Sequence, residues 1–118
     1  MANPNIVNVT SIVGNTALAN VTTVSTNVIV NLVNSNTVVK LNNFIVSNYS
    51  GNNITSDVEY LRSNIAYDII GNVTIPANST LVAVGKDTGL YLIEGDYIRV
   101  RSSANNAAHA VASYEIIS

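Results

Sequence analysis

The feature that most constrains the fold of this chain is a period-two alternation of apolar, mostly β-branched residues with polar ones. Of the 118 residues, 17 are Val, 13 are Ile and 10 are Thr, so about a third favour extended backbone. A strand places successive side chains on opposite faces of a sheet, and alternation is therefore typical of strands buried on one side. The pattern predicts an all-β chain.

Turn-forming residues divide the alternating segments into eight or nine short strands. Clusters rich in Gly, Asn, Pro and Ser occur at 14–16, 34–36, 50–53 and 76–79. Asn tolerates left-handed backbone conformations, which suits it to these turns. Short strands at regular spacing are typical of a sandwich or a barrel. We therefore predict an antiparallel β-sandwich of jelly-roll or immunoglobulin-like type.

Details of the alternation predict local features of several strands. Within 24–32, the apolar even-numbered positions are expected to share one face. The apolar parity changes at Asn42–Asn43, which indicates either a β-bulge or two separate short strands. Gly71 lies inside the segment 65–75 and indicates a second bulge or a close approach. The alanine-rich segment 104–112 has no apolar stripe, so we expect a loop that leads into the last strand.

Ionisable side chains are absent from residues 1–39, and Lys40 is the first of them. The beginning of the chain lacks the basic and apolar regions of a signal peptide, and its many β-branched residues argue against disorder. Uncharged strands left as free edges pair readily with other chains. We expect a single β domain over 1–118, in which residues 1–23 form an extended N-terminal arm that orders against a neighbouring subunit. The alternative is that this segment lies centrally in its own sheet.

Composition disfavours most catalytic and cofactor chemistry. The chain has no Cys, no Trp and a single His, so thiol catalysis and zinc–cysteine sites are excluded. A net charge of −2 argues against nucleic-acid binding, and no apolar run reaches the roughly 18 residues of a membrane span. We predict no enzyme activity, no cofactor, no bound metal, and neither nucleic acid nor membrane as a partner.

Two acidic motifs have simpler structural explanations. Asp87-Thr88-Gly89 copies the triplet of retroviral-type aspartic proteases, but Lys86 would place a charge beside the aspartate, and a hairpin turn explains all three residues. Asp87, Glu94 and Asp96 offer the oxygen ligands of a calcium site without the dense acidic loop that such sites use.

Other polar candidates are also explained by ordinary strand positions. Asp57 and Glu59 have the acid–base chemistry of a glycosidase pair, but the alternation places both on the solvent face. His109 has no Gly-x-Ser-x-Gly segment to supply a catalytic serine.

Two groups of residues are candidates for contact with a partner. Apolar side chains of the N-terminal segment are suited to burial against a neighbour, and a small positive stripe on one later strand is suited to an acidic surface or a phosphate. Ordinary outward-facing residues are the alternative for the stripe. The predicted interface residues are Ile6, Val7, Val9, Ile12, Val13, Tyr97, Arg99 and Arg101.

Five stretches, which together span nearly the whole chain, are similar to segments of one known class of protein. These stretches are Met1–Thr16, Lys40–Asn48, Ile75–Leu81, Leu92–Val100 and Ala110–Ile117. They resemble small virion structural proteins of tailed bacteriophages, of the cyanophage or marine-phage type, and in particular capsid decoration proteins. The resemblance implies a component of the particle and carries no family active site.

Residues and resemblance together predict a non-enzymatic virion structural protein, foremost a capsid decoration or cement protein that stabilises the head. The expected partners are the major capsid protein or other virion proteins, and a homotrimer is expected because decoration proteins commonly sit on local three-fold axes. Assembly in the host bacterial cytoplasm suits a chain without Cys. The alternative is a tail, neck or fibre component that binds host glycans. The absence of Trp and the apolar-face positions of Tyr60, Tyr67 and Tyr114 argue against that alternative.

Overall fold

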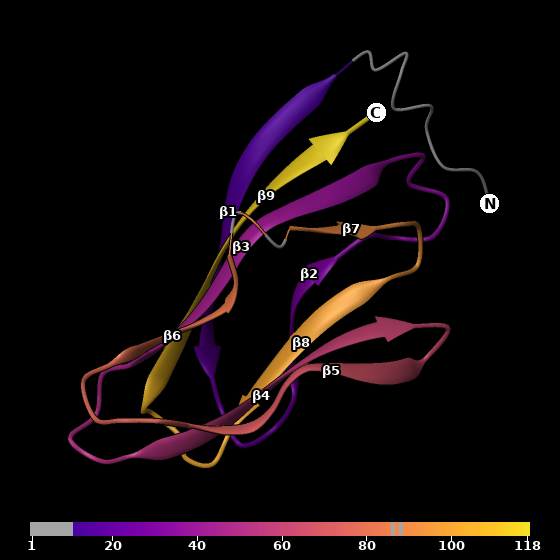
Figure 1. The fold of residues 1–118 in the computed structure, drawn as a ribbon. Coiled ribbons are helices and arrows are strands. Elements are labelled where there is room, and N and C mark those ends of the chain that lie inside the picture. The colour runs from indigo at the N-terminus through magenta and orange to yellow at the C-terminus, as the bar shows by residue number, and fades with distance from the viewer. Residues whose placement is uncertain (1–10, 86, 88) are drawn as a thin grey trace.

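Nine β-strands form the fold of residues 11–85, 87 and 89–118, which are the residues that this computed structural model describes (Figure 1). The strands are β1 (Ile12–Val21), β2 (Thr26–Val30), β3 (Val38–Asn48), β4 (Ile54–Arg62), β5 (Ile65–Ile75), β6 (Thr80–Val84), β7 (Leu90–Leu92), β8 (Tyr97–Ser102) and β9 (Ala108–Ile117). No α-helix occurs within the described ranges. The all-β prediction is confirmed.

The strands form two antiparallel sheets that pack face to face as a sandwich (Figure 1). Sheet A has the order β1-β9-β3-β6, with β7 also paired to β3, and sheet B has the order β2-β8-β4-β5. The pairs β1·β9, β2·β8, β3·β6 and β4·β5 nest one inside another around the β4–β5 hairpin. Nested pairing of this kind is the topology of a jelly roll, one of the two sandwich types that the sequence predicted.

The hydrophobic core lies between the sheets and combines small side chains with large ones. Ala110 and Ala112 of the central strand β9 are fully buried, and Ala112 is paired with Phe44 of β3, which is also fully buried. The small alanines leave room for the phenyl ring at the close spacing of a packed core. From sheet B the buried row is Val58, Ile98 and Val100.

The bulge predicted at Asn42–Asn43 is present in β3. The pairing of β3 with β9 shifts register between Leu41 and Asn43, so that Leu41 and Phe44 both face the core. The Asn43 side chain accepts a hydrogen bond of 3.1 Å from the Ser113 N–H beside the bulge. The pairing of β4 with β5 also shifts next to Gly71, as the sequence predicted.

Asparagine shapes most of the tight turns. Within the described ranges, seven non-glycine residues have positive φ, and six of them are Asn, namely Asn34, Asn36, Asn64, Asn72, Asn78 and Asn106. Asn adopts the left-handed region at lower cost than other residues with a Cβ atom. Part of the high asparagine content is therefore explained by positions where the backbone adopts a positive φ.

Strand β1 corrects the predicted N-terminal arm. Residues 12–21 pair with β9 without a register shift, from Ile12↔Ile117 to Val21↔Ala108, and Val21 is buried in the core. An arm over 1–23 is therefore wrong between residues 12 and 21, because β9 of the same chain supplies the main-chain partners of this segment. Residues 1–10 lie outside the described part of the chain.

In and around strand β2, the side chains that face the core are not the even-numbered ones of 24–32 that the sequence predicts to share a face. Val24 and Leu32 are 72% and 69% exposed, whereas Ile29 and Asn31 are buried. A register shift between Asn27 and Ile29 in the pairing with β8 changes which side chains point inward. The buried Asn31 amide is tolerated because it donates to the Thr37 and Leu92 carbonyls.

Candidate assembly surface

Strand β1 forms an edge of sheet A, and no described strand pairs with its outer side. Ser11 and Ser118 exchange two backbone hydrogen bonds of 3.0 and 2.9 Å at the open end of the β1–β9 ladder. Hydrogen-bonded and non-bonded pairs alternate along an antiparallel ladder, so every second residue of β1 points its main-chain groups away from β9. The residues that do so are Ile12, Gly14, Thr16, Leu18 and Asn20.

The β1 edge lacks the features that usually protect a free strand. Its ten residues contain no charge and no Pro, and its pairing with β9 has no bulge. Asn15 covers one of the outward main-chain groups, because its Oδ1 accepts a hydrogen bond of 2.8 Å from the outward-pointing Thr16 N–H.

The other sheet edges are short or interrupted. Strands β2 and β6 have five residues each and β7 has three, while the pairings of β2 and β6 both carry a register shift. Strand β5 is long, but it contains Asp68 and is bulged beside Gly71. Among the described strands, β1 is therefore the edge best suited to pairing with another chain.

A row of apolar side chains crosses the outer face of sheet A beside this edge. Cross-strand pairing aligns Leu18, Val111, Ile45 and Val82 from β1, β9, β3 and β6. Leu18 is 75% exposed and Val82 is 59% exposed. We call these four residues the outer apolar row.

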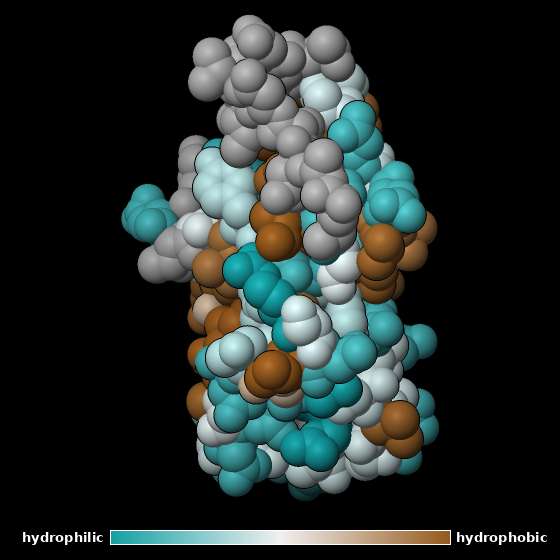
Figure 2. Space-filling model, turned by 90° about the vertical axis from the view of Figure 1, so that its right-hand side faces the viewer, coloured by the Kyte–Doolittle hydropathy of each residue, from teal (hydrophilic) through white to brown (hydrophobic). Residues whose placement is uncertain are grey.

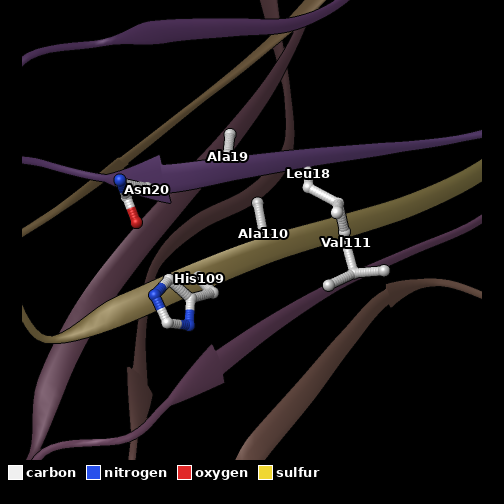
Figure 3. A pocket seen from close by; sticks show the side chains of 6 residues that line it. All are labelled: Leu18, Ala19, Asn20, His109, Ala110 and Val111. Atoms are coloured by element: carbon white, nitrogen blue, oxygen red, sulfur yellow. The ribbon is translucent and has the colours of Figure 1, made fainter.

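A shallow hollow of about 370 Å³ lies between β1 and β9 at one end of the row. Figure 3 shows the six residues that line it, and Leu18 and Val111 lie close together there. The His109 ring at its margin stacks on Tyr49 with the ring centroids 4.4 Å apart. His109 is therefore an exposed surface residue in an aromatic contact. Apolar patches also reach the surface elsewhere, separated by polar residues (Figure 2).

The predicted N-terminal interface residues fall into two groups. Ile12 and Val13 lie at the start of β1 and are 58% and 53% exposed. They are available to a partner even though they belong to the sandwich. Ile6, Val7 and Val9 lie outside the described residues, so their role stays a prediction.

The predicted positive stripe lies on β8 with its charges balanced inside the chain. Arg99 Nε donates to Glu59 Oε1 at 2.8 Å, and Arg101 Nη2 donates to Asp57 Oδ2 at 2.6 Å, both across the β4–β8 ladder. Donation from Arg101 is the main cause that lowers the pKa of Asp57, against an opposing effect of burial. Arg99 and Arg101, with half-buried Tyr97 on the same strand, therefore present paired charge rather than a free positive patch.

A buried polar network that the sequence did not suggest lies between β4 and β8. Asp96 is 1% exposed and accepts hydrogen bonds from Arg62 Nη2 at 2.8 Å and from the Tyr60 hydroxyl. Burial, followed by the Asp96 hydrogen bond, raises the pKa of Tyr60 well above its usual range. Sequence spacing alone does not bring these residues together, since Asp96 is far from the other two along the chain.

The three acidic residues that offer oxygen ligands for calcium in the sequence do not converge in the structure. Asp96 is used by Arg62 and Tyr60, and buried Glu94 accepts the Asn36 N–H at 3.2 Å. Asp87 is exposed in the connection between β6 and β7. No group of three or more Asp, Glu, His or Cys side chains within the described ranges is placed to hold a metal ion.

The described strands form a jelly-roll sandwich in which β1 is the edge least protected against pairing with another chain. No family model matches the chain, and no curated protein matches its sequence. Among solved structures, the chain is similar to one from a study of Bacillus endospore appendages, described there as a family of disulfide-linked pili. The TM-score is 0.50 at 8% identity, covering 99% of this chain and 95% of that one. This likeness shows a shared fold. No helix among the described residues is long and apolar enough to cross a membrane.

Proposed function

We propose that this chain is a non-enzymatic structural subunit that associates with further copies of itself through the outer edge of β1. The observation that carries the proposal is the unprotected edge, which is ten residues long, uncharged and free of bulges. A second strand added to this edge satisfies main-chain donors and acceptors, and the outer apolar row continues the contact onto the sheet face.

The structural neighbour supports a role in a multi-copy assembly. That chain comes from a study that describes endospore appendages as pili, and the similarity of fold covers nearly the whole of both chains. Its pili are described as disulfide-linked, whereas this sequence contains no Cys. In this proposal, copies of this chain therefore associate without disulfide links, through main-chain hydrogen bonds and apolar contacts at the β1 edge.

We propose that the chain lies on the surface of a tailed-phage particle. There it acts as a capsid decoration protein that is bound to the major capsid protein. Support comes from the phage-like stretches of the sequence and from the uncharged N-terminal segment, while the fold suits a virion component equally well. A trimer is the form that we expect on the particle. A tail or fibre component with a host-binding role is the second candidate, and the exposed rings of Tyr67 and Tyr91 favour it.

Substitutions at Gly14 test self-association directly. A Cβ atom at this position meets nothing within 4 Å, so Gly14→Ala keeps the outward N–H and leaves the fold intact. Gly14→Pro removes that N–H and places a ring on the edge, without removing a bond to β9. In sedimentation velocity, we expect oligomers for the wild type and Gly14→Ala and mainly monomers for Gly14→Pro. A wild type that stays monomeric at all concentrations, or equal association of both variants, contradicts the proposal.

Locating the protein in assembled particles tests the phage setting separately. Cryo-electron microscopy of phage particles with a tagged copy of the chain shows whether the label covers the head. Density on every capsomer supports decoration, and density confined to the tail supports the second candidate. Absence of the label from all particles refutes both settings while leaving self-association untouched.

A further inference from the structure

The outer edge of β1 is complementary to a second copy of itself in the antiparallel direction. Its five outward-facing residues occupy every second position from Ile12 to Asn20. When two copies are paired about Thr16, Ile12 lies opposite the partner's Asn20. In the same register Gly14 lies opposite the partner's Leu18, and Thr16 lies on the two-fold axis. Each such pair is able to exchange two backbone hydrogen bonds, so this register uses every outward position of the strand.

Side-chain sizes are also complementary in this register. A Cβ atom at Gly14 meets nothing within 4 Å, so the outer face is open at this position. The side chain that the partner places there is Leu18, which is 75% exposed in the single chain. On the core-facing side of the strand, Val13 is 53% exposed and comes opposite the partner's small Ala19. Large exposed side chains therefore meet small ones on both faces of the paired strands.

A register centred on Leu18 is the main alternative, because it joins the outer apolar rows of the two copies into one line. It pairs only three of the five outward residues, since Ile12 and Gly14 then extend past the end of the partner's β1. The Asn15 side chain competes for the Thr16 N–H in both registers alike. One contact between leucines does not replace the main-chain bonds of two further pairs, so the register centred on Thr16 is favoured.

We propose that two copies pair through β1 in the antiparallel direction, with Thr16 on the two-fold axis and Leu18 packed over the partner's Gly14. This inference rests on the proposed self-association through the β1 edge and specifies its geometry. Sheet A of one copy then continues into sheet A of the other. Pairing occupies the β1 edge of both copies, so the contacts of a trimer on the particle fall to other surfaces of the chain.

Single cysteines test the register, because the chain has no Cys of its own to compete with them. Thr16→Cys places the two thiols at the axis, where the Cα atoms of a hydrogen-bonded pair are about 5.5 Å apart and a disulfide is able to form. Leu18→Cys and Asn20→Cys are the matched controls. Their side chains are exposed on the same face, but in this register each lies at least about 13 Å from its counterpart in the partner.

Under mild oxidation of the full chain, we expect Thr16→Cys to form cross-linked dimers at least tenfold faster than either control, as measured on non-reducing gels. A one-to-one mixture of Gly14→Cys and Leu18→Cys, one of them carrying a size tag, is expected to form the mixed dimer faster than either forms its own.

Sedimentation velocity of the wild type separates the two ways in which the geometry fails. If the wild type associates but Leu18→Cys cross-links fastest, the register is wrong and self-association stands. Equal rates at all three positions indicate a parallel or non-specific contact and overturn the geometry in the same way. A wild type that stays monomeric overturns both the geometry and the self-association on which it rests.

Discussion

Two buried asparagines, Asn31 and Asn48, form hydrogen bonds that join loops distant from each other in the sequence. The Asn48 side chain donates to the carbonyls of Asn52, Ile75 and Pro76 at 2.8 to 3.1 Å. Its Oδ1 accepts from both the N–H and the hydroxyl of Ser50. Asn48 therefore joins the end of β3 to the start of the following loop and to the end of β5. Asn31 plays a similar part beside β7.

Asn48→Ala is expected to lower the free energy of unfolding by about 2–3 kcal/mol, because buried carbonyls then lose their donor. Urea denaturation followed by circular dichroism measures the loss. Asn52→Ala is the control, since Asn52 is exposed and takes part through its backbone N–H and carbonyl only. It is expected to stay within about 0.5 kcal/mol of the wild type. Equal losses in the two variants would show that the amide hub does not stabilise the fold.

Asp57 makes stability depend on acid pH. Its pKa is lowered from 3.8, mainly by the hydrogen bond from Arg101 and also by that from the Asn72 N–H. A carboxylate with a lowered folded-state pKa stabilises the fold fully above its ordinary pKa and loses this contribution as the pH falls through the lowered value.

The urea midpoint of the wild type is therefore expected to fall between pH 5 and about pH 3. Asp57→Asn is expected to start lower at pH 5 and to fall less. Asp68→Asn serves as the comparison, because the exposed Asp68 side chain makes no hydrogen bond or ion pair with the described residues. A fall of the same size in Asp57→Asn as in the wild type would exclude Asp57 as its source.

The strands differ in how much of their structure the sequence predicts. The bulge at Asn42–Asn43 was visible because both halves of β3 use the same core and reveal the change of parity. The partner of β1 was not visible, since β9 lies at the other end of the chain and local alternation carries no pairing information. For the same reason, local alternation does not predict the pairing of Arg99 with Glu59.

Strand β9 illustrates how one element sets the spacing of the sheets. Ala110 is fully buried on its inner face, while Val111 points to the outer face. Ala110→Leu is expected to cost about 1–3 kcal/mol by overpacking the core. Val111→Leu changes the same strand on its open face and is expected to stay within about 0.5 kcal/mol. Thermal and urea unfolding of both variants distinguish a strand effect, which would affect both, from a core effect.

At the scale of the whole molecule, the two candidate interfaces differ in their response to salt. Contacts through β1 and the outer apolar row involve no charged side chain, so association is expected to be unchanged between low and high ionic strength. Contacts through Arg99 and Arg101 would weaken as salt screens them. Sedimentation of the full chain across a salt series measures this directly. Dissociation at high salt would move the interface from β1 to the β8 face.

Nested pairing also determines the order in which the chain becomes able to fold during synthesis. The β4–β5 hairpin pairs neighbours in sequence, so it is the first ladder that a growing chain is able to close. Ile12 finds its partner only when Ile117 has been made. At a translation rate of about 5–20 residues per second, β1 waits unpaired for roughly 5–20 s. Strand β1, which forms the free edge of the folded protein, is thus also the strand that stays unpaired for the longest time during synthesis. Unpaired β1 strands of neighbouring nascent chains on the same messenger RNA are therefore able to pair with one another before β9 has been made.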